Sequence, residues 1–180
     1  MERISDKIDI LVDRIPELPF FIFAFIYLLT SPKPREIVHV FSICFIFIVI
    51  GLGVGMMLKL LFKIPRPKRH YSIKAIDYGF PSLHSLISAG ALTLVWYVEP
   101  TGVILLLPIT LFYMISRHHL GVHRWSSILA GSILGIIIAI LCITYLYEIY
   151  FNVKLEIFFT ILFFLLPPLI TLLRNHYVLK

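Results

Sequence analysis

Six stretches of the chain contain no charged residue, and they constrain its fold more than any other feature. A helix needs about 20 apolar residues to cross the hydrocarbon core of a membrane. Inside lipid the backbone must satisfy its own hydrogen bonds, so each stretch is expected to form an α-helix. The chain is therefore predicted to be an all-α, polytopic membrane helix bundle with about six transmembrane helices. The stretches are residues 18–32, 37–58, 78–98, 100–116, 125–147 and 157–173.

The composition excludes a water-soluble domain. Hydrophobic residues make up 59% of the 180 residues and charged residues 14%, whereas a soluble domain is about 45–50% apolar and roughly 25% charged. The formal net charge is +6, which suits anionic lipid, a phosphate-bearing substrate or topology signals. We expect an integral, multi-pass protein of the cell membrane, with membrane lipids as partners and no nucleic acid. The oligomeric state is left open.

The chain is expected to form one membrane-integral domain over residues 1–180, because no linker or repeat divides it. Residues 1–15 repeat apolar side chains at helical spacing beside charged neighbours, which predicts a short N-terminal amphipathic helix on the membrane surface. Two pairs of glycines four residues apart, Gly51 with Gly55 and Gly131 with Gly135, indicate close helix packing. His39, near the start of the second stretch, is expected at the membrane interface.

Two polar segments carry most of the reactive side chains. Residues 59–84 lie between the second and third stretches, and residues 116–127 between the fourth and fifth. Two helices separate the segments, so both are expected to emerge on one face of the bundle. Their cations and histidines are Lys59, Lys63, Arg66, Lys68, Arg69, His70, Lys74, His84, Arg117, His118, His119, His123 and Arg124.

This collection suits a phosphate ester. Arginine holds phosphate oxygens in a bidentate fork, lysine adds a point charge, and a helix N-terminus offers unpaired N–H groups. Ser82 precedes an apolar run and is the predicted N-cap of such a helix. Two histidines facing a phosphate can attack phosphorus and protonate the leaving oxygen. No metal or other cofactor is required if several cations neutralise the developing charge.

The spacing of these residues resembles three signatures of the type 2 phosphatidic acid phosphatase (lipid phosphate phosphatase) superfamily. The first is Lys59, six further residues, then Arg66-Pro67. The second is Pro81-Ser82-Leu83-His84, and the third is Ser116-Arg117, five further residues, then His123. The resemblance covers roughly residues 50 to 135, with all three signatures in order.

The resemblance implies a role for each matched residue. His123 would be the nucleophile that forms a phosphohistidine, and His84 the general acid that protonates the leaving lipid alcohol and then activates water. The phosphate-binding residues would be Lys59, Arg66, Ser82 and Arg117. Members of this family work without a metal.

The chain departs from the family pattern at two positions. Ser127 stands where the third signature ends in an aspartate that orients the nucleophilic histidine, so Ser127 is the candidate orienting residue here. A hydroxyl accepts a hydrogen bond but adds no charge. The open explanations are a slower enzyme, a substitute carboxylate such as Asp77, an engineered substitution, or a non-catalytic relative. Leu83 stands where the family has glycine, which is expected to add bulk beside the phosphate cradle.

The predicted function is hydrolysis of a phosphate monoester or diphosphate on a lipid. The candidate substrates are polyprenyl phosphates or diphosphates, phosphatidic acid and phosphatidylglycerophosphate. The alternatives are a lipid phosphotransferase that uses the same histidine chemistry, and a lipid-phosphate-binding protein without turnover. The face of the membrane that holds the site stays open, because the Lys and Arg distribution favours the cytoplasmic side whereas many members of the family work on the other side.

Overall fold

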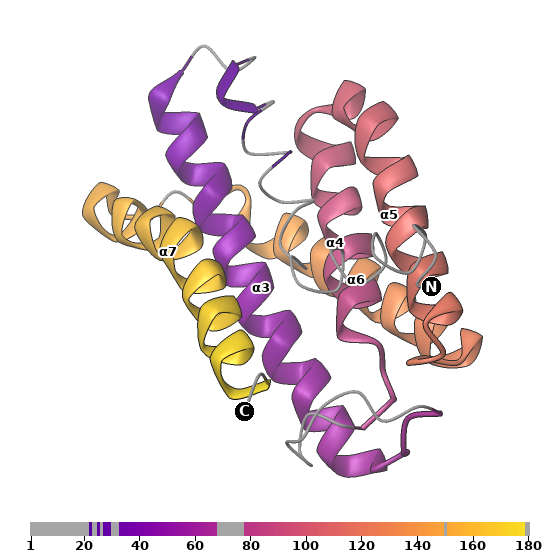
Figure 1. The fold of residues 1–180 in the computed structure, drawn as a ribbon. Coiled ribbons are helices and arrows are strands. Elements are labelled where there is room, and N and C mark those ends of the chain that lie inside the picture. Colours follow the sequence, from indigo (N-terminus) through magenta and orange to yellow (C-terminus); the bar gives the residue numbers. More distant parts are fainter. Residues whose placement is uncertain are drawn as a thin grey trace.

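The computed structural model describes residues 33–67, 78–149 and 151–178, together with residues 22, 25 and 27–29. The all-α class is confirmed. The predicted helix over residues 1–15 lies outside the described residues, and the first uncharged stretch lies largely outside them. The elements are α3 (Pro34–Phe62), α4 (Leu83–Val98), the 3₁₀ turn η1 (Pro100–Gly102), α5 (Val103–His119), α6 (Trp125–Leu146) and α7 (Val153–Val178) (Figure 1).

Three segments of the described chain are long and apolar enough to cross a membrane: Pro34–Phe62, Pro100–His119 and Trp125–Leu146. Helix α4 is apolar but shorter. Large apolar side chains on these helices face outward, and Ile104 is 76% exposed. Exposed apolar surface on this scale favours contact with lipid over water. The protein is therefore membrane-embedded, while the number of six spans stays a prediction.

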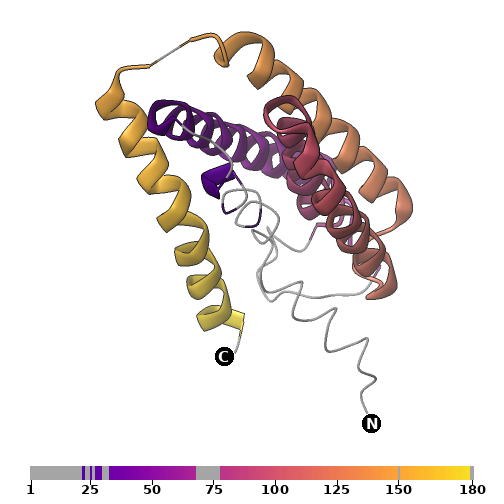
Figure 2. The ribbon, with the colours of Figure 1, turned by 90° about the horizontal axis from the view of Figure 1, so that it is seen from above.

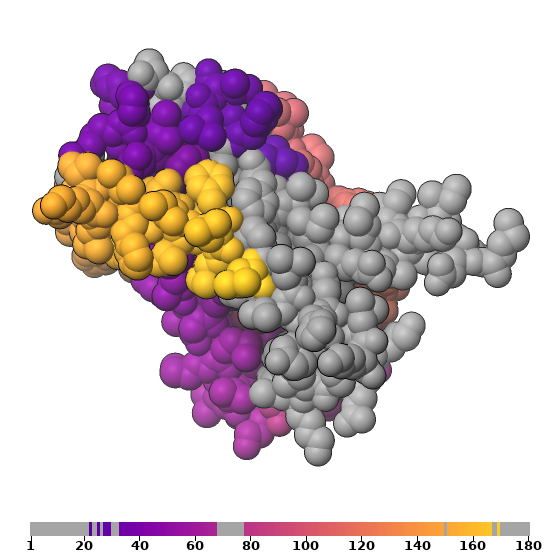
Figure 3. All heavy atoms as spheres, turned by 60° about the vertical axis from the view of Figure 1, so that its left-hand side comes forward, coloured from indigo at the N-terminus to yellow at the C-terminus, as the bar shows by residue number. Residues whose placement is uncertain are grey.

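Helix α4 lies at the centre of the bundle, in contact with α3, α5 and α6. Helix α7 packs against α3, and Figure 2 shows α3 lying between α7 and the other helices. Figure 3 shows the side chains of α7 crossing over α3, whose two ends appear on either side of it. As a result, α3, which ends at the predicted site, is held from two sides.

The two glycine pairs bring the helices unusually close together, as the sequence predicted. A Cβ atom on Gly135 would lie 2.0 Å from the Leu86 carbonyl oxygen, and one on Gly131 would lie 2.3 Å from that of Ser82. Both glycines therefore allow the backbones of α4 and α6 to touch. On α3, Gly51 and Gly55 leave space for leucine side chains of α4.

The buried carboxylate of Glu156 joins the N-terminal ends of α3 and α7. The Glu156 carboxylate is fully buried, and its Oε1 lies 3.0 Å from Nδ1 of His39. It also accepts a hydrogen bond from the Phe151 N–H (3.0 Å) and pairs with Nε of Arg35 (3.4 Å). Nε2 of His39 lies 2.7 Å from the Tyr147 carbonyl oxygen. His39 was expected at the membrane interface; these contacts hold its ring inside the protein, where it is 2% exposed, and its depth in the membrane stays a prediction.

Candidate active site

The two polar segments meet at one end of the bundle, where α3 and α5 end and α4 and α6 begin (Figure 1). Within the first segment, Pro65 and Tyr78 form an antiparallel bridge, and the Gly79 N–H donates to the Ile64 carbonyl (2.7 Å). Between the segments, the Ser82 N–H donates to the Ser127 carbonyl (3.0 Å). The expectation that both segments share one face is therefore confirmed.

His123 lies in the turn between α5 and α6 and is only 2% exposed. Its Nδ1 lies 2.8 Å from the carbonyl oxygen of Gly79, and its backbone N–H donates to the Arg117 carbonyl (3.3 Å). A carbonyl oxygen only accepts hydrogen bonds, so Nδ1 carries the proton that fills this contact. In the neutral ring, Nε2 is then the nitrogen with a lone pair.

The surroundings of His123 disfavour its protonated form. Burial, together with the positive charges of Arg66, Lys59 and Arg117, lowers the pKa of His123 from 6.5 to about 3. The hydrogen bond to Gly79 opposes these effects only in part. The imidazole is therefore neutral throughout the physiological pH range, which is the state that a nucleophile requires.

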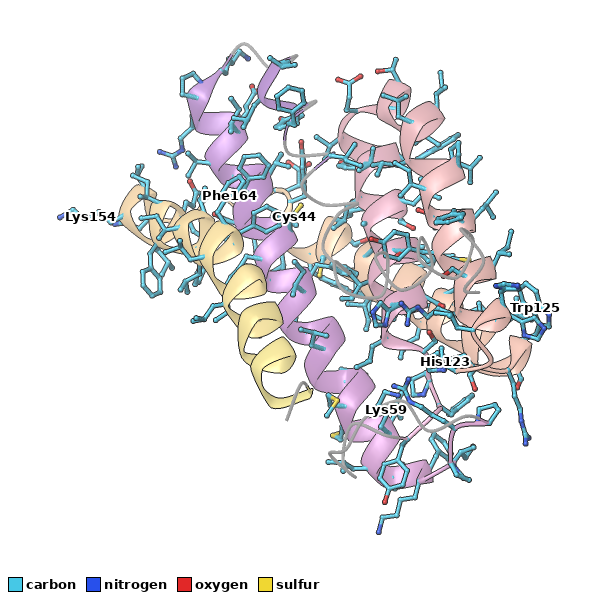
Figure 4. All side chains as sticks on the ribbon, viewed as in Figure 1. Cys44, Lys59, His123, Trp125, Lys154 and Phe164 are labelled. Atoms are coloured by element: carbon cyan, nitrogen blue, oxygen red, sulfur yellow. The ribbon has the colours of Figure 1, made fainter. Side chains whose placement is uncertain are left out.

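The three predicted clamp cations approach the imidazole from three elements. Lys59 comes from the last turn of α3 and is 1% exposed; its Nζ donates to the carbonyl oxygen of Tyr78. Arg117, near the end of α5, is fully buried, and Arg66 follows the bridge in a half-buried position. Figure 4 shows Lys59 and His123 at the same end of the bundle. Three cations gathered around one imidazole favour an anionic ligand.

The start of α4 supplies the predicted phosphate cradle. Ser82 is fully buried and is the N-cap of α4; its Oγ accepts hydrogen bonds from the N–H and the hydroxyl of Ser85 (3.4 and 2.9 Å). His84 is the second residue of the helix, with a buried Nε2 atom. The Leu83 side chain points toward α3, where its Cδ2 would meet a Cβ on Gly55 at 2.3 Å. Leu83 thus packs between helices, and its bulk is directed at α3.

Ser127 lies in the first turn of α6 and is 5% exposed. The imidazole hydrogen bond expected for its side chain is instead made by the Gly79 carbonyl. The suggested substitute, Asp77, lies outside the described residues, as do Lys68, Arg69, His70 and Lys74.

His118 and His119 are both exposed, and the His118 ring stacks on the ring of Trp125 with centroids 4.6 Å apart. Lys63 is exposed too, and its left-handed backbone (φ 51°) ends α3 and turns the chain toward Arg66. These residues border the site at its surface.

Sequence reasoning missed the two backbone carbonyls that hold the site together, those of Tyr78 and Gly79. A carbonyl group is present at every residue, so side-chain patterns do not reveal which ones bind a lysine or a histidine. The glycine was the one available signal, because a Cβ atom at position 79 would lie 3.3 Å from the Pro65 oxygen and the Arg66 Cα.

A buried neutral histidine, three cations and a capped helix N-terminus form the candidate site of a membrane-embedded helical protein. The sequence model of the PAP2 superfamily matches residues 39–151, more than half of the chain. The protein belongs to this superfamily, whose membership supports a phosphatase-type function on lipid phosphates. No curated protein and no solved structure matches the chain.

Proposed function

We propose that the protein hydrolyses a phosphate monoester or diphosphate on a membrane lipid through a phosphohistidine at His123. The observation that carries this proposal is the neutral imidazole, whose Nδ1 is engaged by Gly79 while Lys59, Arg66 and Arg117 surround it. A lone pair on Nε2 amid cations is suited to attack a phosphorus atom whose oxygens those cations hold.

In the first step, Nε2 of His123 attacks phosphorus as the bond from phosphorus to the lipid oxygen breaks. His84 gives a proton to the departing oxygen, so the lipid leaves as an alcohol, or as a monophosphate when the substrate is a diphosphate. The products are the leaving lipid and a phosphohistidine. The position of His84 in the first turn of α4 supports this role, because the same helix start directs its N–H groups at the phosphate.

In the second step, neutral His84 accepts a proton from a water molecule that attacks phosphorus. The bond from phosphorus to Nε2 breaks, which releases inorganic phosphate and regenerates neutral His123. The three cations hold the phosphate oxygens through both steps. They contribute most in the transition state, where they stabilise the charge that develops on those oxygens. No further co-reactant is needed.

A lipid substrate fits the position of the site. The residues that end α3 beside it, Leu61 and Phe62, are 70% and 51% exposed, and Trp125 at the start of α6 is also exposed. Apolar and aromatic side chains at a span end are typical of the membrane interface. The phosphate would reach the buried cations while the lipid chains stay in the bilayer of the cell membrane.

The test is phosphate release by purified protein in lipid nanodiscs. The substrates are an undecaprenyl diphosphate, a phosphatidic acid and a phosphatidylglycerophosphate. His123→Ala is expected to reduce release from the preferred lipid to background, whereas His119→Ala, which changes an exposed histidine at the end of α5, retains it. Equal background release by the wild type and His123→Ala on every substrate would refute hydrolysis.

The same reactions separate the alternatives. If the phosphoryl group appears on a second lipid and little inorganic phosphate forms, the protein is a phosphotransferase. If labelled lipid phosphate binds, binding falls in Arg117→Ala, and no product forms, the protein is a binding protein.

A further inference from the structure

We infer that the carbonyl group of Gly79 is the positioning acceptor for the proposed nucleophile, and that it takes over the orienting function for which Ser127 lacks a carboxylate. This inference rests on the proposed function of His123. It assigns a role to a backbone group that lies two residues before Pro81, the first residue of the second signature.

The hydrogen bond itself determines the tautomer. With Nδ1 of His123 2.8 Å from the Gly79 oxygen, the neutral ring has its proton on Nδ1 and its lone pair on Nε2. The opposite tautomer would place two lone pairs against each other across that contact. The carbonyl therefore holds the ring in one orientation and leaves Nε2 to attack.

The acceptor is itself held by the rest of the site. The Gly79 N–H donates to the Ile64 carbonyl (2.7 Å), and the preceding residue, Tyr78, bridges to Pro65. The Tyr78 carbonyl accepts a hydrogen bond from Lys59. Two successive peptide groups thus bind a clamp lysine and the nucleophile. The pairing that positions Gly79 also sets the place of Arg66, the next residue after Pro65.

Space around Gly79 is tight. A Cβ atom there would lie 3.3 Å from both the Pro65 oxygen and the Arg66 Cα, so a larger residue would require small shifts of these neighbours. Glycine lets this peptide lie between the clamp and the imidazole without such shifts.

The first experiment reads the tautomer directly. Protein with ¹⁵N-labelled histidine is compared in nanodiscs with His123→Gln, so that the difference spectrum contains the His123 ring alone. The expected result between about pH 5 and pH 8 is a proton on Nδ1 and none on Nε2. A proton on Nε2 would overturn the inference, whatever the activity of the protein.

The second experiment weakens the acceptor without changing a side chain. Replacing Phe80 with its α-hydroxy analogue converts the Gly79 carbonyl into an ester carbonyl, which is a poorer acceptor. The Phe80 N–H that is removed donates no hydrogen bond within the described residues. The matched control is the α-hydroxy analogue of Val122, which weakens the carbonyl of Gly121, two residues before His123 in the chain.

The expected result is a kcat about tenfold lower for the Phe80 analogue, the rate effect of about one hydrogen bond, with KM unchanged and the Val122 analogue like the wild type. A kcat equal to that of the wild type would count against Gly79 as the positioning acceptor. The spectra do not depend on turnover, so the positioning role of Gly79 and the hydrolase activity can be refuted independently. A proton on Nδ1 with background phosphate release would leave the positioning intact and refute the hydrolase.

Discussion

Alanine in place of Gly131 is expected to separate α4 from α6 at the point where α4 begins. The added Cβ would lie 2.3 Å from the Ser82 carbonyl oxygen and 3.2 Å from its carbon. Carbon and oxygen atoms that only touch stay about 3.3 Å apart, so the two backbones must move apart by about 1 Å. Because the obstacle is main chain, no side-chain rotation can relieve the contact.

That displacement falls on the proposed catalytic groups. Ser82 caps α4, and its N–H is bonded to the Ser127 carbonyl, while His84 follows two residues later. A shift of about 1 Å between reacting groups can reduce a rate about 100-fold. Overpacking of a close contact costs about 1–3 kcal/mol of stability. We therefore expect kcat to fall about 100-fold in Gly131→Ala while the protein still folds at room temperature.

The assay is phosphate release from the preferred lipid in nanodiscs, with the thermal midpoint measured on the same sample. The control is Gly53→Ala on α3, where a Cβ meets nothing within 4 Å. It adds the same methyl group and should leave kcat unchanged. If Gly131→Ala keeps the wild-type kcat and thermal midpoint, the close approach of α4 and α6 does not set the geometry of the site.

Three further predictions concern ionisable groups inside the protein. Glu156→Ala removes the buried carboxylate that binds His39, Arg35 and the Phe151 N–H, and the loss of these contacts is expected to cost about 1–3 kcal/mol of stability. Glu36→Ala, from an exposed pair, should cost less than about 1 kcal/mol; equal thermal midpoints would contradict this. Because burial lowers the pKa of His123 to about 3, below pH 6.5 the unfolded chain binds a proton that the folded chain does not. From pH 8 to pH 5 the wild type should lose about 2 kcal/mol more stability than His123→Gln, and parallel stability profiles would refute the lowered pKa. Ser127→Asp adds a negative charge beside the candidate site and should weaken inorganic phosphate binding at least tenfold, as measured by calorimetry. The neutral variant Ser127→Asn should bind phosphate like the wild type. Equal affinities of the Asp and Asn variants would show that a charge at position 127 does not repel the bound phosphate.

The helices could be predicted from sequence because a backbone surrounded by lipid must satisfy its hydrogen bonds within the segment. The uncharged stretch 37–58 lies within α3, and the stretch 125–147 agrees with α6 to one residue. The boundaries were less accurate where local residues decide them. Helix α3 begins earlier, at Pro34, and α4 begins at Leu83 because Ser82 caps it.

The side chains that gather at the site could also be predicted, because three spacings and one helical hairpin place them on one face. Their contacts could not. Leu83 was expected beside the phosphate, yet the glycine at position 55 of another helix accommodates it. Likewise, His39 binds Glu156, which is 117 positions away in the sequence. Such partners depend on how the helices cross, which local patterns do not encode.

Ser127 illustrates why a departure from a family pattern does not by itself decide function. A carboxylate at this position would orient the imidazole and would also offset the charge that the ring gains when Nε2 bonds to phosphorus. The Gly79 carbonyl can do only the first of these, because it carries no net charge. In the proposed reaction the substrate supplies the second, because its phosphate oxygens lie between the ring and the three cations. A bound phosphate dianion would offset the charge of those cations and would also stabilise the positive phosphoimidazole. In the proposed reaction orientation and charge compensation thus come from different groups, and we expect a nucleophile without the carboxylate to react more slowly than one with it.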